Sequence, residues 1–132
     1  MSVSDPVADF LTGIRNAIRA KHRKVDVPSS LLKAEIAKLL LRERYINNYK
    51  LIQDQGHGLL RLYLKYDEKD LSVIRGLRRI SSPGRRVYVN KGKLPRVMGG
   101  MGMSVVSSSS GVLSDKEARE RGVGGELLCY IW

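Results

Sequence analysis

The chain has 132 residues, a length that suits one ordinary domain or two very small ones and excludes two large cores. Hydrophobic residues make up 42% and charged residues 28%, which is typical of a globular protein, and no apolar run approaches the roughly 20 residues that span a bilayer. The formal net charge of +11 favours a polyanionic partner, with nucleic acid the first expectation and an anionic membrane surface the second.

The first half of the chain is expected to form an αβαββ lobe over residues 1–66. Asp5 and Pro6 supply an N-cap and a first helical residue, and Ser29 and Ser30 offer an N-cap for a second helix. Alternating leucines predict a half-buried strand, so both helices are expected to cover one face of a sheet. The expected elements are a helix over residues 6–20, a strand over 25–28, a helix over 31–44, and strands over 45–53 and 59–66.

The second half, residues 67–132, is expected to form a mainly β lobe with one short helix. The charged segment 67–70 marks the boundary between the lobes. Ser114 and Glu117 have the spacing of a capping box, which predicts that the short helix starts there and ends before Gly122. The fold class is therefore α+β in two small lobes. The other expected elements are a basic β-hairpin made by residues 71–80 and 85–90 around a turn at 81–84, a strand over 101–106, a serine-rich tip, and a final strand over 126–132.

Positive charge is concentrated in the second half. Residues 75–96 contain eight basic residues and no carboxylate, which favours nucleic-acid binding over the alternative that the charge only keeps the protein soluble. If Tyr88 points the same way as Arg86, a ring and a cation share one surface suited to RNA; the alternative is a partly buried tyrosine that covers the sheet. Arg15, on the polar side of the first helix, belongs either to a solvated face or to a surface along a phosphate backbone.

The motifs of catalysis and metal binding are missing from the sequence. Cys129 is the one cysteine, and His22 and His57 have no partner at metal-ligand spacing, so no metal and no disulfide within the chain are predicted. The serines at 107–110 lack a neighbouring base, and the glycines match neither the P-loop nor the dinucleotide pattern. We therefore expect no enzyme, no cofactor and no small-molecule substrate. The start of the chain lacks the pattern of an export signal, which predicts a cytoplasmic protein.

Several separate motifs, in order along nearly the whole chain, resemble the bacterial type of the small-subunit ribosomal protein family numbered eight (S8). The strongest match is the C-terminal run GMSVVSSSSGVLSDKEAR over residues 102–119, followed by Gly122 and the GGE run at 124–126. Shorter matches are DPVAD at 5–9, IRNA at 14–17, PSS at 28–30, LKY at 64–66 and RISSPGRRVY at 79–88.

This resemblance implies a two-lobed structural protein of the ribosome that binds directly to a helix in the central domain of small-subunit ribosomal RNA and supports assembly. Its partners would be that RNA and neighbouring small-subunit ribosomal proteins, with no membrane. Recognition would lie mainly in the second lobe, where the serine loop would meet the RNA minor groove. The predicted RNA-binding residues are Ser107, Ser108, Ser109, Tyr88, Gly124, Glu126, Arg86, Lys91, Lys93, Arg15 and Ser30.

Three questions stay open at this stage. Glu126 either accepts hydrogen bonds from RNA or supports the serine loop by accepting backbone N–H bonds. The family usually has threonine at Ser108 and a longer side chain at Ser110, so nearby cations would carry more of the phosphate contacts. The alternative functions are a translational repressor that binds a messenger RNA mimic of the ribosomal site, and a general basic DNA-binding or membrane-surface module.

Overall fold

The computed structural model describes residues 4–54 and 57–132, and their contacts form two compact units. Phe10–Arg75 form the N-terminal unit. Gly76–Trp132 and residues 4–9 form the C-terminal unit. The boundary expected after residue 66 comes earlier in the chain than this division, and a separation into lobes 1–66 and 67–132 stays a prediction.

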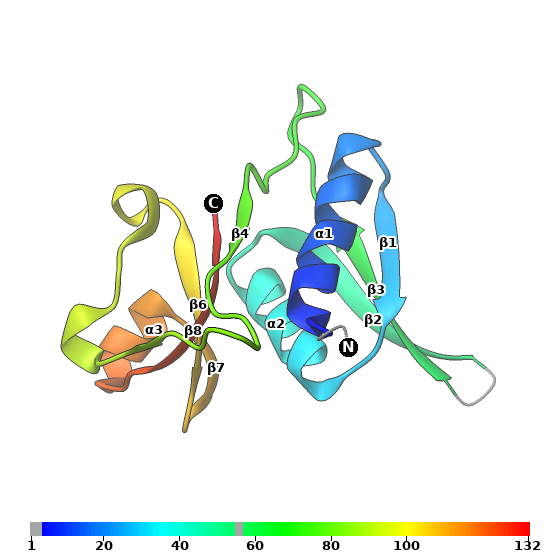
Figure 1. Cartoon of the computed structure of the whole chain (residues 1–132). Helices are drawn as coiled ribbons and strands as arrows, with labels where there is room; N and C mark the ends of the chain where they lie inside the picture. Colours follow the sequence, from blue (N-terminus) through cyan, green and yellow to red (C-terminus); the bar gives the residue numbers. More distant parts are fainter. Residues whose placement is uncertain (1–3, 55–56) are drawn as a thin grey trace. The chain divides into compact units, whose positions relative to one another are not determined.

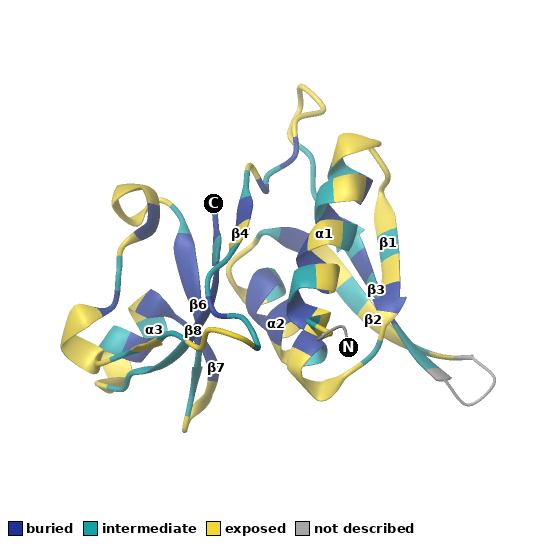
Figure 2. Cartoon of the chain, in the orientation of Figure 1, coloured by how far each residue is buried: buried dark blue, intermediate teal, exposed yellow. Residues whose placement is uncertain are grey.

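The first half of the chain has the expected αβαββ order (Figure 1). Its strands form an antiparallel sheet in which β3 lies between β1 and β2. Leu60, Leu62 and Leu64 alternate along β3 and are buried, together with the apolar stripes of both helices (Figure 2). The elements are α1 (Pro6–Arg19), β1 (Lys24–Pro28), α2 (Leu31–Arg42), β2 (Ile46–Asp54) and β3 (His57–Leu64).

Local chemistry sets the helix ends where the sequence predicted them. The Asp5 carboxylate accepts a hydrogen bond from the backbone N–H of Ala8 at 3.2 Å, as an N-cap does. The Ser30 hydroxyl accepts from the backbone N–H of Lys33 at the start of α2. In the C-terminal unit, Ser114 and Glu117 form the predicted capping box, and Gly122 ends the helix with a φ of 65°.

The C-terminal unit is built around its last strand. β8 pairs with β4, β5 and β6, and β6 pairs in turn with β7, all antiparallel. One side of this sheet packs against α3 through a core of Leu94, Val106, Leu113, Ala118 and Leu127. The elements are β4 (Leu77–Arg79), β5 (Tyr88–Val89), the 3₁₀ turns η1 (Lys91–Lys93) and η2 (Val97–Gly100), β6 (Met103–Ser108), β7 (Gly111–Ser114), α3 (Asp115–Arg121) and β8 (Gly125–Ile131).

The predicted hairpin of residues 71–80 and 85–90 is wrong. β4 and β5 do not pair with each other; both pair with β8, β4 with residues 129–131 and β5 with residues 125–126. The seven residues of β8 provide an edge long enough for two short strands in succession. The turn at Ser82–Arg85 carries the chain from one strand to the other, and its single bridge extends no further.

The serine-rich tip is a tighter structure than the sequence predicted. β6 continues through Ser108, and Gly111–Ser114 form β7, a strand that the sequence pattern did not reveal because four residues show too little alternation. The two strands form a hairpin in which Ser109 and Ser110 are the turn residues. The tip is therefore a β-hairpin rather than a loop between a strand and a helix.

None of the helices in residues 4–54 and 57–132 has the length and apolar character needed to cross a membrane.

Candidate nucleic-acid interface

Strand register brings three of the predicted RNA-binding residues into one row. Glu126 in β8 lies opposite Tyr88 in β5 and opposite Ser107 in β6. Residues directly opposite each other in paired strands project from the same face of the sheet. Arg86 precedes Tyr88 by two residues, the spacing of side chains on one face of an extended chain. These residues define what we call the recognition face: Arg86, Tyr88, Ser107 and Glu126.

The opposite side of the same strands is the core of the unit. Val106 and Leu127, the neighbours of Ser107 and Glu126, are buried in it, and Val87 and Val89 pack against it. Because alternate residues point to opposite sides, Tyr88 is left facing away from the core, with 69% of its surface exposed. The alternative of a partly buried tyrosine covering the sheet is therefore wrong.

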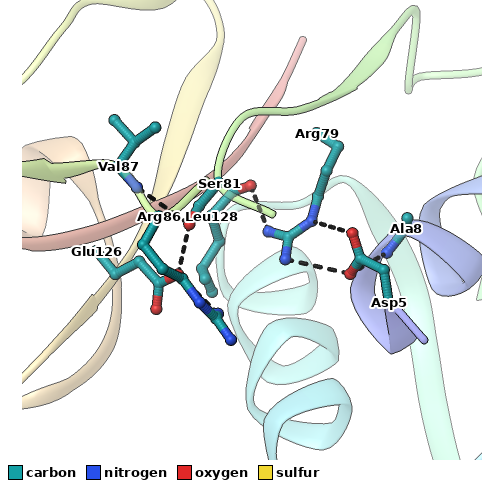
Figure 3. Close-up of polar contacts among 8 residues, drawn as sticks. All are labelled: Asp5, Ala8, Arg79, Ser81, Arg86, Val87, Glu126 and Leu128. Atoms are coloured by element: carbon teal, nitrogen blue, oxygen red, sulfur yellow. Dashed lines mark hydrogen bonds and ion pairs between the residues drawn. The ribbon is translucent and has the colours of Figure 1, made fainter. Parts of the chain in front are cut away.

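The Glu126 carboxylate is held by two hydrogen bonds from the segment that leads into β5 (Figure 3). Its Oε2 atom accepts from the Ser81 hydroxyl at 2.5 Å and from Nη1 of Arg86 at 3.0 Å. The Ser81 oxygen accepts in turn from the backbone N–H of Val87 at 3.2 Å. Glu126 therefore fastens residues 81–87 to β8.

This arrangement corrects one of the two roles predicted for Glu126. In the part of the chain that the structure describes, its hydrogen bonds go to Ser81 and Arg86 and not to the backbone of the serine loop. Burial alone would raise the pKa of Glu126, but the hydrogen bonds from Ser81 and Arg86 outweigh it and hold the pKa below its usual value. The carboxylate therefore stays ionised at neutral pH, and Arg86 compensates its charge.

A second ion pair fixes the backbone next to this network. Nε and Nη2 of Arg79 donate to the two Asp5 carboxylate oxygens at 3.1 and 3.2 Å, and Nη1 donates to the Leu128 carbonyl at 2.7 Å (Figure 3). Only 15% of the Arg79 side chain is exposed. Arg79 is thus a structural residue of the C-terminal unit. It is one of the eight basic residues of segment 75–96 whose charge favoured nucleic-acid binding.

Two glycines allow the strands around the recognition face to approach each other. A Cβ atom on Gly124 would lie 2.3 Å from the Val89 carbonyl oxygen and 2.9 Å from the Lys91 nitrogen. A Cβ atom on Gly125 would lie 2.2 Å from the Ser107 carbonyl oxygen. Such distances exclude any side chain at either position. The glycines thus hold the start of η1 and the end of β6 on the two sides of β8.

The serines of the tip divide into two kinds. The Ser108 hydroxyl donates to the Gly111 carbonyl at 2.8 Å and accepts from the Ser110 backbone N–H at 3.1 Å, so it shapes the turn. Ser107, half-buried, and Ser109, exposed, have no hydrogen bond from their hydroxyls to any part of the chain that the structure describes. These two hydroxyls are available to a ligand.

Two lysines follow β5, the strand that carries Tyr88. Lys91 and Lys93 are exposed in η1, directly after β5. Within residues 4–54 and 57–132 neither has an ion-pair partner. Their charges are therefore free to meet an anion.

Two predicted residues belong to the other unit. Ser30 is the N-cap of α2 in the N-terminal unit, which gives its hydroxyl a structural role. Arg15 lies half-buried in α1 and has an interaction partner within the chain. Neither belongs to the recognition face.

Ser81 is the residue of this network that the sequence did not single out. It is fully buried and joins Glu126 to the backbone before β5. Little in the sequence indicates this role, because a serine before a Ser-Pro-Gly segment is typical of an ordinary turn. Its partner Glu126 also lies 45 residues further along the chain.

Comparison with known proteins gives one consistent family. The family model described as "Ribosomal protein S8" matches residues 5–132. The small ribosomal subunit protein uS8 of Natranaerobius thermophilus is 54% identical over 132 residues, with both chains covered completely. The proteins of the same name from Moorella thermoacetica and Geotalea uraniireducens are 56% and 58% identical, covering 98% and 100% of this chain and all of their own length.

Proposed function

The chain belongs to the ribosomal protein S8 family, and we propose that it is a non-enzymatic structural component of the small ribosomal subunit. It binds directly to a helix in the central domain of small-subunit ribosomal RNA, lies beside neighbouring small-subunit proteins and supports assembly. The C-terminal unit makes the specific contact through its recognition face. The observation that carries this proposal is the row of Tyr88, Glu126 and Ser107 across three strands.

The chemistry of this row suits the minor groove of RNA. That groove is wide and shallow and displays 2′-hydroxyls and base edges, which short hydroxyl groups reach at close range. Ser107 and Ser109 each offer one donor and two acceptor positions that the described chain leaves unused. The exposed Tyr88 ring provides a flat apolar surface for a sugar or an unstacked base.

The negative charge of Glu126 is compatible with RNA because the protein already satisfies it. The carboxylate accepts from Ser81 and Arg86, and 16% of its side chain is exposed, against 49% for Arg86. An approaching RNA therefore meets the guanidinium more than the carboxylate. Lys91 and Lys93 add contacts to phosphates, which raise affinity without reading sequence.

The serines allow a direct test in full-length protein. Ser107→Ala with Ser109→Ala should weaken binding to a folded fragment of small-subunit ribosomal RNA, at about 0.5–1.5 kcal/mol for each neutral hydrogen bond lost, without lowering the unfolding temperature. Fluorescence anisotropy measures the affinity, and duplex DNA of equal length is the comparison ligand. Wild-type protein should prefer the RNA by a wide margin.

Ser108→Ala is the matched control within the same hairpin. Because its hydroxyl makes two hydrogen bonds inside the turn, this variant should lose stability, which thermal unfolding measures. Lys93→Ala should instead reduce the dependence of binding on salt, by about 0.7–0.9 log units for one phosphate contact. Unchanged RNA affinity in the Ser107 and Ser109 double variant, or equal wild-type affinity for RNA and DNA, would contradict the proposal.

A further inference from the structure

The N-terminal unit contains a pocket of about 190 Å³ that the proposed function leaves unassigned. It is lined by Lys21, Arg23, Tyr66 and Asp70. These residues come from the connection after α1 and from the segment after β3, which hydrogen bonds join: Lys21 Nζ donates to the Asp70 carbonyl at 2.5 Å, and the Tyr66 hydroxyl donates to the His22 carbonyl at 2.6 Å. The Tyr66 ring is thereby fixed, with Lys21 Nζ at 5.7 Å from its centroid.

The chain turns out of α1 at Lys21. Lys21 follows α1 with a φ of 60°, and the backbone N–H groups of Lys21 and His22 donate to the carbonyls of Ile18 and Ala17. This is the helix-ending arrangement that glycine normally occupies, because a side chain is strained there. Glycine is therefore the substitution at position 21 that the backbone accepts most readily.

The groups at the pocket are of three chemical kinds. Lys21 and Arg23 are exposed cations. Tyr66 supplies an aromatic ring. Asp70 is exposed, and its carboxylate has no ion pair with any residue in the two described ranges. A free inorganic anion would gain from the cations but would be repelled by Asp70, so the set suits a ligand that carries both an anionic group and hydrogen-bond donors.

We propose that this pocket binds one unstacked guanine nucleotide of the ribosomal RNA, an inference that rests on the proposed function and adds a second RNA contact to it. Arg23 and Lys21 meet the phosphate, and the base packs against the part of the Tyr66 ring that Lys21 leaves uncovered. The two oxygens of Asp70 accept from the N1–H and N2–H groups on the Watson–Crick edge of guanine. Adenine and cytosine offer one donor beside an acceptor on that edge, and uracil offers one donor between two acceptors, so guanine matches a carboxylate best.

The size of the pocket agrees with one base rather than a whole ligand. Sites that enclose a complete small molecule usually measure about 300–1,000 Å³. Here the sugar and phosphate lie at the exposed rim, beside the cations. A nucleotide in a single-stranded loop or bulge of RNA can present its base in this way, whereas a base stacked within a helix cannot.

The test follows the amide resonances of the full-length protein during titration with guanosine monophosphate, inosine monophosphate and inorganic phosphate. Inosine monophosphate differs from the guanosine compound only by the missing N2 amino group. We expect shifts at residues 21–24 and 66–71, with roughly tenfold tighter binding of the guanosine compound because one hydrogen bond to a charged group is lost in the other. Phosphate alone should bind more weakly than either.

Three variants make the assignment specific. Lys21→Gly suits the local backbone and should bind guanosine monophosphate at least several-fold more weakly while the fold stays intact. Asp70→Asn keeps a residue that tolerates the φ of 60° at this position and should remove the preference for guanosine over inosine monophosphate. The control is Lys50→Ala, which deletes a lysine that lies 5.6 Å from the centroid of the Tyr63 ring and does not line the pocket.

The RNA itself provides the second arm, because kethoxal modifies unpaired guanines at N1 and N2. Wild-type protein should protect one reactive guanine of small-subunit ribosomal RNA, and Asp70→Asn should leave it reactive while overall RNA binding persists. Equal binding of guanosine and inosine monophosphate, shifts outside the pocket, or protection independent of Asp70 would overturn the proposal. None of these outcomes depends on Ser107 or Ser109, so failure here is separate from failure of the proposed function.

Discussion

Replacing Glu126 by glutamine tests the architecture of the recognition face, because charge and geometry predict opposite results. Removing a negative charge beside RNA should strengthen binding if only electrostatics mattered. In the structure, however, Glu126 holds Ser81 and Arg86, and Ser81 holds the backbone N–H of Val87. Loosening this network should move Arg86 and Tyr88 and weaken specific binding.

The hydrogen bonds set the size of the expected effects. A bond from Ser81 to a charged acceptor is worth about 1.5–3 kcal/mol and one to a neutral amide about 0.5–1.5, so Glu126→Gln should cost about 1 kcal/mol of folding free energy. The pair with Arg86 adds little to stability, because half of that side chain is exposed and water screens it. If the loosened network costs the same free energy in RNA binding, affinity for the specific RNA should fall roughly fivefold, since 1.4 kcal/mol is a factor of ten.

The pH dependence of stability gives a further signature of the same residue. The pKa of Glu126 is lower in the folded protein than its ordinary value, despite the burial that opposes ionisation, because Ser81 and Arg86 bond the carboxylate. A lowered pKa contributes stability that is present above the unfolded-state pKa and lost as the pH falls through the folded-state pKa. Glu126→Gln should therefore lose stability at neutral pH and show a flatter decline in acid.

Urea unfolding at several pH values and RNA binding at two salt concentrations measure these effects. Glu120→Gln, the same chemical change at an exposed position of α3, is the matched control and should alter neither stability nor the preference for specific RNA. The decisive quantity is the ratio of affinities for the folded ribosomal RNA fragment and for duplex DNA. A ratio that stays constant or rises in Glu126→Gln refutes the positioning role.

Three further predictions concern stability and reactivity. Gly125→Ala should disrupt the C-terminal sheet, since its Cβ would lie 2.2 Å from a backbone oxygen of β6, whereas Gly84→Ala, with no atom within 4 Å, should leave the thermal unfolding temperature nearly unchanged. Asp5→Asn keeps the helix cap but loses the ion pair with Arg79, so it should lower the free energy of unfolding by about 1–2 kcal/mol near neutral pH. Burial alone would raise the pKa of Asp5, but the hydrogen bonds from Arg79 and the backbone outweigh it and lower the pKa in the folded protein. The loss should therefore be smaller in acid, where the wild-type carboxylate becomes protonated. Cys129 should resist alkylation in native protein and react after unfolding, because burial raises the pKa of its thiol to about 12.

Local sequence signals predicted the fold well where neighbouring residues decide the outcome. The capping box of Ser114 and Glu117 and the N-cap at Asp5 depend on bonds that span three residues, and both are present. Alternating leucines in β3 depend on the pleat of a single strand. These features need no knowledge of the rest of the chain.

Strand pairing could not be predicted from local sequence in the same way. A turn between two short β-prone segments usually indicates a hairpin, yet β4 and β5 both pair with the distant β8. The choice depends on which edge offers more hydrogen bonds and apolar contact, and that is a property of the whole sheet. The same reason hid the link between Ser81 and Glu126, which are adjacent only after β8 has paired with β5.

The structure separates polar residues that bond within the protein from polar residues that are open to a ligand, a distinction that composition does not make. Arg79, Ser30 and Ser108 have the residue types expected at an RNA surface, yet their polar groups are used inside the protein. Where a polar group is already paired, a ligand must break a bond to gain one, and the net gain is small. Specific recognition should therefore concentrate on groups that the fold leaves unpaired and holds in place, and the Ser107 hydroxyl beside the fixed Glu126 meets both conditions.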